Sequence, residues 1–434
     1  MPATPLHELD AWQAARLLAR RELNAVDLVR ACLDRIEESE PRVRAFAHLD
    51  PDAALAQARR LDAGPVRGLL HGLPLGVKDL FDSADLPTAY GSAVYAGHRP
   101  AADAAALALC REAGAVVLGK TVSTEFAYFQ PGATRNPRGI ALGVDHTPGG
   151  SSSGSAAAVA GGMLPLALGT QTAGSIIRPA AFCGVVGFKA SHGRVPRGGI
   201  KSLSESLDTV GGFGRSVRDV ALLGAVLTGD ARLTHGVEET PAAPRIGLAR
   251  TPEWPQADAA TQQLFETAAA TLAPLAGTLA DAALPRELDD WVVLQKAVMA
   301  FEMARSLSHE RIHHRARLSE RLNALMDEGM AIDGQTHAAH LARRAAAARA
   351  IEPVFDRFDL LLTPSAIGEA PRGLDATGDP LFCRGWTLLG LPCIHLPLAT
   401  GPQGLPLGLQ LVGRHGDDHR LLAGARWVHE RLAR

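Results

Sequence analysis

The sequence has 434 residues, and its 44 Lys plus Arg against 46 Asp plus Glu leave a formal net charge of −2. This near balance argues against a strongly basic surface of the kind that binds nucleic acid. The five cysteines are dispersed and odd in number, which favours reduced thiols over a disulfide framework. Because the N-terminus also lacks the apolar core of a signal peptide, the sequence predicts a cytoplasmic protein.

The N-terminal part of the chain predicts helices that carry no recognisable chemistry. Thr4 and Pro5 are typical of an N-cap and a first helical residue, so a helix is expected to run from there through Arg20. Apolar residues recur at helical spacing over residues 25–38, and a third helix is expected over residues 51–61.

From Gly72 onward, strand and helix patterns alternate. Strands are expected over residues 75–77 and 115–118, with a helix over residues 102–113 between them. This alternation predicts an α/β fold with a largely buried sheet between helices, and it places Lys78 at the end of a strand.

The stretch between Asp145 and Arg178 contains no Asp, Glu, Lys or Arg. The turns over residues 149–155 and 169–175 are too polar for a membrane span, so the stretch is expected inside the protein. Buried hydroxyl groups need hydrogen-bond partners or a function. We therefore expect serines from the two turns to face one cavity.

Further along the chain, the pattern predicts elements that return to the same sheet. Helices are expected over residues 259–275 and through most of 288–354. Strands are expected over residues 245–249, 358–362, 394–398 and 407–412. No Pro/Ser/Gly-rich linker or internal repeat interrupts this pattern, which favours one continuous domain.

Seven short motifs follow one another along the chain. They are Gly-Leu-Pro-Leu-Gly-Val-Lys-Asp at 72–79, Pro-Gly-Gly-Ser-Ser-Ser-Gly-Ser at 148–155, Gly-Thr-Gln-Thr-Ala-Gly-Ser at 169–175, Arg-Pro-Ala-Ala-Phe-Cys-Gly at 178–184, Ser-Leu-Asp-Thr-Val-Gly-Gly at 206–212, Leu-Gly-Leu-Pro-Cys at 389–393 and Gly-Leu-Gln-Leu-Val-Gly at 408–413. With these motifs the sequence resembles the amidase signature family of serine hydrolases. Gln171 and the Ser-Ile-Ile-Arg-Pro run at 175–179 are most similar to malonamidase-like members.

The resemblance implies a Ser-Ser-Lys triad. Ser175 would be the nucleophile, Ser151 a bridging serine after a cis peptide bond, and Lys78 the base. A serine hydroxyl is a weak nucleophile until a base removes its proton. Lysine can be that base only when neutral, and burial lowers its pKa. Ser151 would relay the proton and return it to the leaving amine.

The resemblance also implies the rest of the site. Backbone N–H groups would form an oxyanion hole for the developing negative charge. The residues expected there are Thr172, Ala173 and Gly174, together with Ser175 itself. The residues expected to contact substrate are Arg178, Gln171 and Ser152. The guanidinium of Arg178 suits a substrate carboxylate, and a structural ion pair is the alternative role for it.

One amidase signature domain over residues 1–434 is therefore expected, with a mixed sheet between helices. It would comprise N-terminal helices at 1–65, a catalytic core at 66–220 and a helical substrate-pocket region at 285–355. The expected reaction is hydrolysis of a small amide through an acyl-enzyme, with no metal or organic cofactor and no membrane or nucleic-acid partner. The choice between monomer and homodimer stays open.

Two other functions remain as alternatives. The chain would act with partner subunits if it were the ammonia-producing subunit of a tRNA-dependent amidotransferase. A catalytically silent scaffold is a second alternative, although Lys78, Ser151 and Ser175 are all present.

Three short motifs point elsewhere and are given less weight. Residues 114–121 have the spacing of a phosphate-binding loop, but their middle positions are strand formers. Residues 309–313 match the zinc motif H-E-x-x-H in a stretch that looks solvated. Residues 150–154 match G-x-S-x-G, which would make Ser152 a nucleophile, but a turn precedes them instead of a strand.

Overall fold

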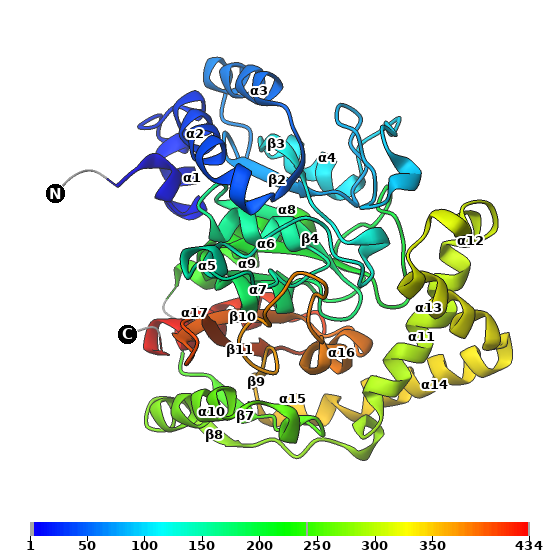
Figure 1. Cartoon of the computed structure of the whole chain (residues 1–434). Helices are drawn as coiled ribbons and strands as arrows, with labels where there is room; N and C mark the ends of the chain where they lie inside the picture. Colours follow the sequence, from blue (N-terminus) through cyan, green and yellow to red (C-terminus); the bar gives the residue numbers. More distant parts are fainter. Residues whose placement is uncertain (1–3, 240–241, 433–434) are drawn as a thin grey trace.

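An 11-stranded mixed sheet runs through the molecule in the order β1-β3-β2-β4-β6-β5-β10-β11-β9-β7-β8, with helices packed around it (Figure 1). This computed structural model describes residues 4–239 and 242–432. The strands are β1 (Phe46–Leu49), β2 (Pro74–Lys78), β3 (Val116–Thr121), β4 (Leu166–Gln171), β5 (Val186–Lys189), β6 (Thr209–Gly214), β7 (Arg245–Leu248), β8 (Thr278–Asp281), β9 (Leu360–Pro364), β10 (Cys393–Thr400) and β11 (Pro406–Val412).

The helices surround this sheet and also form an extended layer at one end of the molecule, where α11 to α14 lie together (Figure 1). They are α1 (Ala11–Ala19), α2 (Ala25–Val43), α3 (Pro51–Ala63), α4 (Ala105–Glu112), α5 (Pro137–Ala141), α6 (Ser153–Ala160), α7 (Ile177–Cys183), α8 (Val217–Thr228), α9 (Arg232–Glu238), α10 (Ala259–Leu272), α11 (Trp291–Ser306), α12 (Ser308–His313), α13 (Glu320–Ala331), α14 (Gly334–Ala350), α15 (Glu352–Arg357), α16 (Leu381–Leu388) and α17 (Asp418–Leu432).

Strand direction changes across the sheet. Strand β2 lies parallel to β3 and β4, while β6, β5, β10 and β11 pair antiparallel with their neighbours. The central strands β2, β3 and β4 are buried at every position, as their near-continuous apolar runs predict. Together with the flanking helices, this arrangement confirms the predicted single α/β domain with a mixed sheet.

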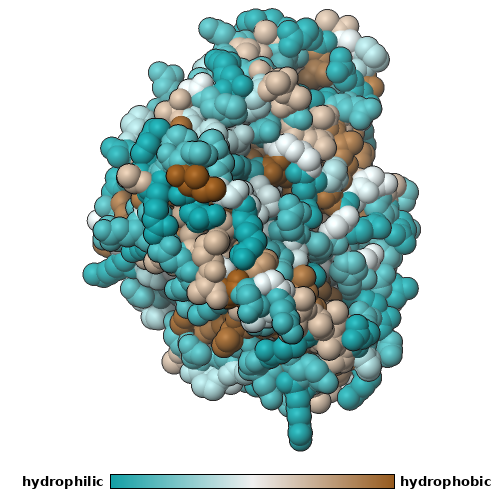
Figure 2. Space-filling model, turned by 90° about the vertical axis from the view of Figure 1, so that its right-hand side faces the viewer, coloured by the Kyte–Doolittle hydropathy of each residue, from teal (hydrophilic) through white to brown (hydrophobic). Residues whose placement is uncertain are grey.

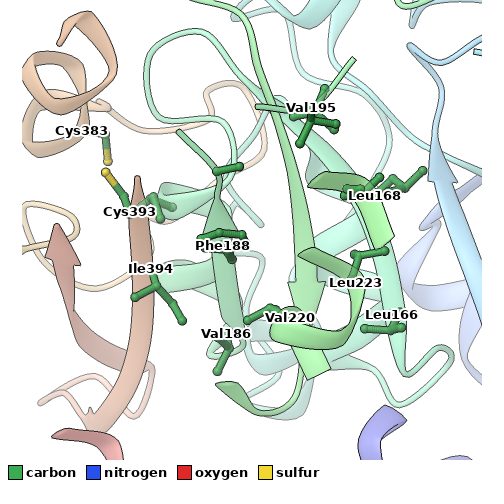
Figure 3. Close-up of a cluster of buried hydrophobic side chains, with 14 of the residues drawn as sticks. Leu166, Leu168, Val186, Phe188, Val195, Val220, Leu223, Cys383, Cys393 and Ile394 are labelled. Carbon is green, nitrogen blue, oxygen red and sulfur yellow. The ribbon is translucent and has the colours of Figure 1, made fainter. Parts of the chain in front are cut away.

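The core forms where helix α8 packs on the middle of this sheet. Figure 3 shows Val220 and Leu223 of α8 among side chains of neighbouring strands, including Leu166 of β4 and Phe188 of β5. Helix α8 begins with a reciprocal capping box between Ser216 and Asp219, which satisfies backbone N–H groups at its first turn. The pairing of β5 with β10 then carries the same core into the C-terminal part of the chain.

The face that includes the α11 to α14 layer is mostly hydrophilic, with small scattered apolar patches (Figure 2). Within residues 4–239 and 242–432, every helix is too short or too polar to cross a membrane. The cysteines Cys32, Cys110, Cys183, Cys383 and Cys393 are free thiols, as predicted.

Some predicted boundaries were wrong for identifiable reasons. The first α-helix begins at Ala11 and not at Pro5, because the Asp10 side chain caps it by accepting the Gln13 N–H. Strand β4 runs to Gln171, into the turn expected at residues 169–175. It therefore includes the first part of the segment that we expected to be a loop.

Candidate active site

Two parallel strands bring the first polar groups of the site together. Strands β2 and β4 are parallel neighbours, so their carboxyl ends lie at the same edge of the sheet. Lys78 is the last residue of β2 and Thr170 lies near the end of β4. The Lys78 Nζ donates a hydrogen bond to Thr170 Oγ1 at 2.7 Å.

The hydroxyl of Ser151 also contacts Lys78 Nζ. Lys78 Nζ donates to Ser151 Oγ at 2.8 Å, although 73 positions separate the two residues in sequence. The peptide bond between Gly150 and Ser151 is cis, as the resemblance implied. The preceding Gly149 has φ +78°, and a Cβ there would lie 2.8 Å from the Cα of Pro179, so this turn has no room for a side chain.

Ser175 lies in the turn between β4 and α7, in the wall of a small cavity. The wall of this cavity also includes Ser151, Arg178 and Phe129. Among the described residues, no hydrogen bond joins Ser175 to Ser151, so the two serines meet through the shared cavity. Catalytic hydrogen bonds often form only when substrate binds.

The predicted oxyanion turn has free donors. The N–H groups of Ala173, Gly174 and Ser175 have no acceptor within residues 4–239 and 242–432. By contrast, the next two N–H groups, of Ile176 and Ile177, both donate to Gln171 Oε1. Free donors beside a cavity are what the stabilisation of an oxyanion requires.

A buried carboxylate holds the side chain of Thr172 in this turn. Thr172 Oγ1 donates to Asp208 Oδ1 at 2.6 Å, while Asp208 Oδ2 accepts the N–H groups of Leu203 and Ser204. Burial raises the pKa of Asp208, and these hydrogen bonds oppose the shift. The sequence placed Asp208 in a motif but gave it no role, because its partner Thr172 lies on the turn after β4.

Complete burial sets the protonation of Lys78. The residue has 0% exposure, and burial lowers its pKa to about 7, while the negative charge of Asp208 opposes the shift. A lysine with a pKa near neutrality has a substantial neutral fraction, which a base requires. The expectation that burial would depress this pKa is met.

Two residues expected to contact substrate have buried side chains with partners inside the protein. Gln171 is fully buried, and its side-chain amide links the N–H groups at the start of α7 to Thr387 Oγ1. Ser152 is also fully buried, and its hydroxyl donates to the backbone carbonyl of Thr170. Neither lines the cavity. These side chains satisfy neighbouring backbone and hydroxyl groups, and their contact with substrate stays a prediction.

Arg178 reaches the cavity but already has several partners. Its Nη1 donates to Gly378 O and its Nη2 to Gly150 O, each at 2.6 Å, and Nη2 also donates to Thr377 Oγ1 at 3.2 Å. Its buried Nε has no partner among the described residues. Burial lowers the pKa of Arg178 to about 9. The guanidinium therefore supports the Gly150–Ser151 turn, while its Nε–H is left without a partner in the described part of the chain.

The three misleading motifs have structural explanations. Residues 116–121 form β3, so the segment with phosphate-loop spacing is a buried strand. In the H-E-x-x-H segment, the Glu310 carboxylate accepts hydrogen bonds from Tyr95 and Lys201, which commits it to packing. The burial of Ser152 removes it as a nucleophile of the G-x-S-x-G type.

The fold and the chemistry of this cavity define a hydrolase built on a mixed α/β sheet, and comparison with known proteins gives its family. The family model described as Amidase matches residues 27–422. The chain is 34% identical to a glutamyl-tRNA(Gln) amidotransferase subunit of Chloroflexus aggregans, covering 96% of this chain and 95% of that protein. It is also 34% identical to a putative amidase AmiD of Mycobacterium bovis, covering 96% and 93%.

Solved structures agree. A structure described as crystal structure of amidase has a TM-score of 0.87 at 32% identity, covering 98% of this chain and 100% of the other. The native peptide amidase from Stenotrophomonas maltophilia has a TM-score of 0.82 at 30% identity, covering 99% and 98%. The chain belongs to the amidase family. It is an enzyme that hydrolyses amide C–N bonds.

Proposed function

We propose that the protein hydrolyses a small amide through an acyl-enzyme on Ser175, with Ser151 as the proton relay and Lys78 as the base. The observation that carries this proposal is the hydrogen bond from the buried Lys78 Nζ to Ser151 Oγ, in a cavity wall shared with Ser175. The depressed pKa of Lys78 supplies the neutral amine that the first step needs.

The reaction has two halves. Ser175 Oγ attacks the amide carbon while its proton passes to Ser151, whose own proton passes to Lys78. The oxyanion then faces the free N–H groups of the turn at residues 173–175. Collapse breaks the C–N bond, and Ser151 returns a proton to the leaving nitrogen. In the second half, water attacks the acyl-enzyme through the same proton relay and releases a carboxylic acid, which regenerates Ser175.

For the substrate, we propose a short amide that bears a carboxylate. Arg178 lines the cavity, is buried, and donates its hydrogen bonds to carbonyl and hydroxyl oxygens of the described residues instead of to a carboxylate. A buried guanidinium without a carboxylate partner favours an anionic ligand. The small cavity favours a short acyl group.

Ammonia release from a panel of acidic, neutral and aryl amides tests this function, with wild type and Ser175→Ala compared in the presence of chelator. Ser83→Ala is a matched control, because Ser83 is buried and its hydroxyl has no partner within the described residues. We expect release by wild type and Ser83→Ala and none by Ser175→Ala. Release by Ser175→Ala would refute the nucleophile assignment.

A second candidate function is the ammonia-producing subunit of a tRNA-dependent amidotransferase, because a relative at 34% identity carries that name. Glutamine hydrolysis that needs added partner subunits would support it. Turnover of small amides by the purified chain, as a monomer or a homodimer, would support the first proposal. The five free thiols support a reducing, cytoplasmic location for either.

A further inference from the structure

Helix α16 contacts the oxyanion turn through the hydroxyl of Thr387. Thr387 Oγ1 lies 2.8 Å from Ala173 O, to which it donates, and it also lies within 3.0 Å of Cys383 O in its own helix. The same oxygen accepts a hydrogen bond from Gln171 Nε2 at 2.9 Å. One hydroxyl of α16 therefore links the carbonyl of Ala173 to the side chain that anchors the start of α7.

A second set of contacts joins α16 to the backbone carbonyl of Thr172, the residue before Ala173. Arg384 Nη1 donates to Gln295 Oε1 at 2.5 Å, and Gln295 Nε2 donates to Thr172 O at 3.0 Å. Because arginine is always a donor, it fixes the oxygen of the Gln295 amide on its own side. The amide nitrogen must then face Thr172. Figure 1 shows α16 beside α11, the helix that carries Gln295.

The third contact is steric. A Cβ on Gly174 would lie 2.5 Å from Cβ of Pro380 and 3.0 Å from Cβ of Cys383, distances that an ordinary side chain does not tolerate. The turn therefore packs directly on the first turn of α16, and only glycine fits there.

These contacts fix the directions of the oxyanion donors. In a planar trans peptide, the carbonyl of one residue and the N–H of the next point in opposite directions. Holding Thr172 O and Ala173 O against α16 and α11 therefore turns the N–H groups of Ala173 and Gly174 away from them. We propose that Thr387 and the Arg384–Gln295 pair are positioning residues that preorganise the oxyanion turn for catalysis at Ser175. This inference rests on the proposed function.

Labelling by a fluorophosphonate tests the inference without knowledge of the natural substrate. Ser175 Oγ would form a bond to phosphorus while the P–F bond breaks, its proton passing to Ser151 and fluoride leaving. The phosphoryl oxygen mimics the oxyanion. We expect labelling of Thr387→Val and Gln295→Glu to be about 10- to 100-fold slower than that of wild type, because misplacing an oxyanion donor should cost less than the roughly 100- to 1000-fold loss caused by removing one.

Two variants serve as controls. Thr387→Ser keeps the hydroxyl and should restore the rate to within about threefold of wild type. Thr363→Val removes a fully buried hydroxyl that has no partner within residues 4–239 and 242–432, so it matches the chemical change without touching the turn. Gln295→Glu keeps the size of the side chain and its pairing with Arg384 while removing the donor to Thr172. Thermal melting shows whether each variant remains folded.

The possible outcomes distinguish failure of this inference from failure of the proposed function. Slow labelling of Thr387→Val and Gln295→Glu, with normal labelling of both controls, supports the inference. Equal labelling of wild type, Thr387→Val and Gln295→Glu at Ser175 overturns it and leaves the proposed function intact. Wild type that is not labelled at Ser175 overturns the proposed function, and the inference falls with it.

Discussion

The position of Lys78 in the fold explains why it suits the proposed role of base. It ends a buried strand, and both hydrogen bonds from its Nζ go to hydroxyl groups, those of Ser151 and Thr170. Hydroxyl partners satisfy either protonation state, whereas a carboxylate in direct contact would hold the lysine charged. The low pKa follows from this burial, with Asp208 as the opposing charge.

The first prediction concerns the pH dependence of the reaction. Because burial lowers the pKa of Lys78 to about 7, the neutral base becomes more abundant as pH rises toward that value. We expect kcat/KM to rise about tenfold per pH unit below this pKa and to level off above it. A pH profile of amide hydrolysis measures this. A profile that stays flat through neutrality would contradict Lys78 as the base.

The same pKa predicts an effect on stability. The folded pKa of about 7 lies below the reference value of 10.5, so the unfolded chain binds more protons between these two values. Stability from this group is therefore lowest below about pH 7 and rises as pH increases toward 10.5. Lys78→Met should be inactive. It has no titrating group at this position, so it lacks this pH-dependent loss of stability.

Thermal melting of wild type and Lys78→Met at several pH values measures this effect. We expect the Tm of wild type, relative to that of Lys78→Met, to increase with pH above neutrality. A constant difference between the two proteins would show that Lys78 keeps its proton when folded.

If Arg178 binds a substrate carboxylate, its replacement should change KM differently for acidic and neutral amides. Arg178→Gln should raise KM for carboxylate-bearing amides about 10-fold or more and leave KM for neutral amides nearly unchanged, because a charge-assisted hydrogen bond contributes about 1.5–3 kcal/mol. It should also lower kcat for both substrate classes, since its Nη2 supports Gly150 O. Thr377→Val is the matched control, because it removes one Arg178 contact and keeps the guanidinium. Equal KM changes for both classes would count against carboxylate recognition.

At the scale of elements, the segment at residues 202–208 explains why the oxyanion turn depends on distant parts of the chain. Asp208 accepts hydrogen bonds from two backbone N–H groups of this segment and from Thr172. Glu302 of α11 also accepts from Ser206 Oγ at 2.6 Å, which ties the segment to the helical layer.

Asp208→Asn should therefore weaken both stability and catalysis. One carboxylate oxygen becomes an N–H₂ group facing backbone or hydroxyl donors, and a buried unsatisfied donor costs about 1–3 kcal/mol. We expect a lower Tm and a lower kcat, with little change in KM for neutral amides. Chemical denaturation and steady-state kinetics measure the two effects. An unchanged kcat would show that Thr172 does not need this anchor.

Local motifs explain which parts of the site could be predicted from sequence. Lys78, Ser151 and Ser175 each lie in a short motif, and the fold places all three at one edge of the sheet. The buried contacts of Gln171 could not be predicted, because its partner Thr387 is 216 positions away on a helix that the pattern did not reveal. Side-chain orientation depends on such tertiary contacts, whereas strand and helix alternation depends on local periodicity.

The same distinction explains the errors in the elements. Strand β5 and strand β6 were not predicted, since short segments rich in glycine carry a weak alternation signal. Yet β6 lies between β4 and β5, and its glycines allow close approach: a Cβ on Gly211 would lie 2.0 Å from Phe188 O. The close packing that makes these glycines necessary is visible only in the folded structure.

At the scale of the whole molecule, one sheet joins the N-terminal and C-terminal parts of the chain. Antiparallel pairing of β5 with β10 brings Lys189 opposite Cys393, and the buried Lys189 Nζ donates to Leu391 O across this junction. Asp418 at the start of α17 accepts hydrogen bonds from the N–H and hydroxyl of Ser191. The two halves therefore share backbone pairing and buried polar contacts.

This continuity predicts a single cooperative unfolding transition. Neither half can lose β5 or β10 without exposing unpaired strand edges and the apolar core between them. Calorimetry should show one peak, and tryptophan fluorescence should report the same Tm, because Trp12 lies in α1 and Trp386 in α16 at opposite ends of the sequence. Two resolved transitions, one for residues before β7 and one for those after it, would mean that the shared sheet does not couple the halves. The helical layer beside the cavity would then be able to loosen separately from Lys78, Ser151 and Ser175.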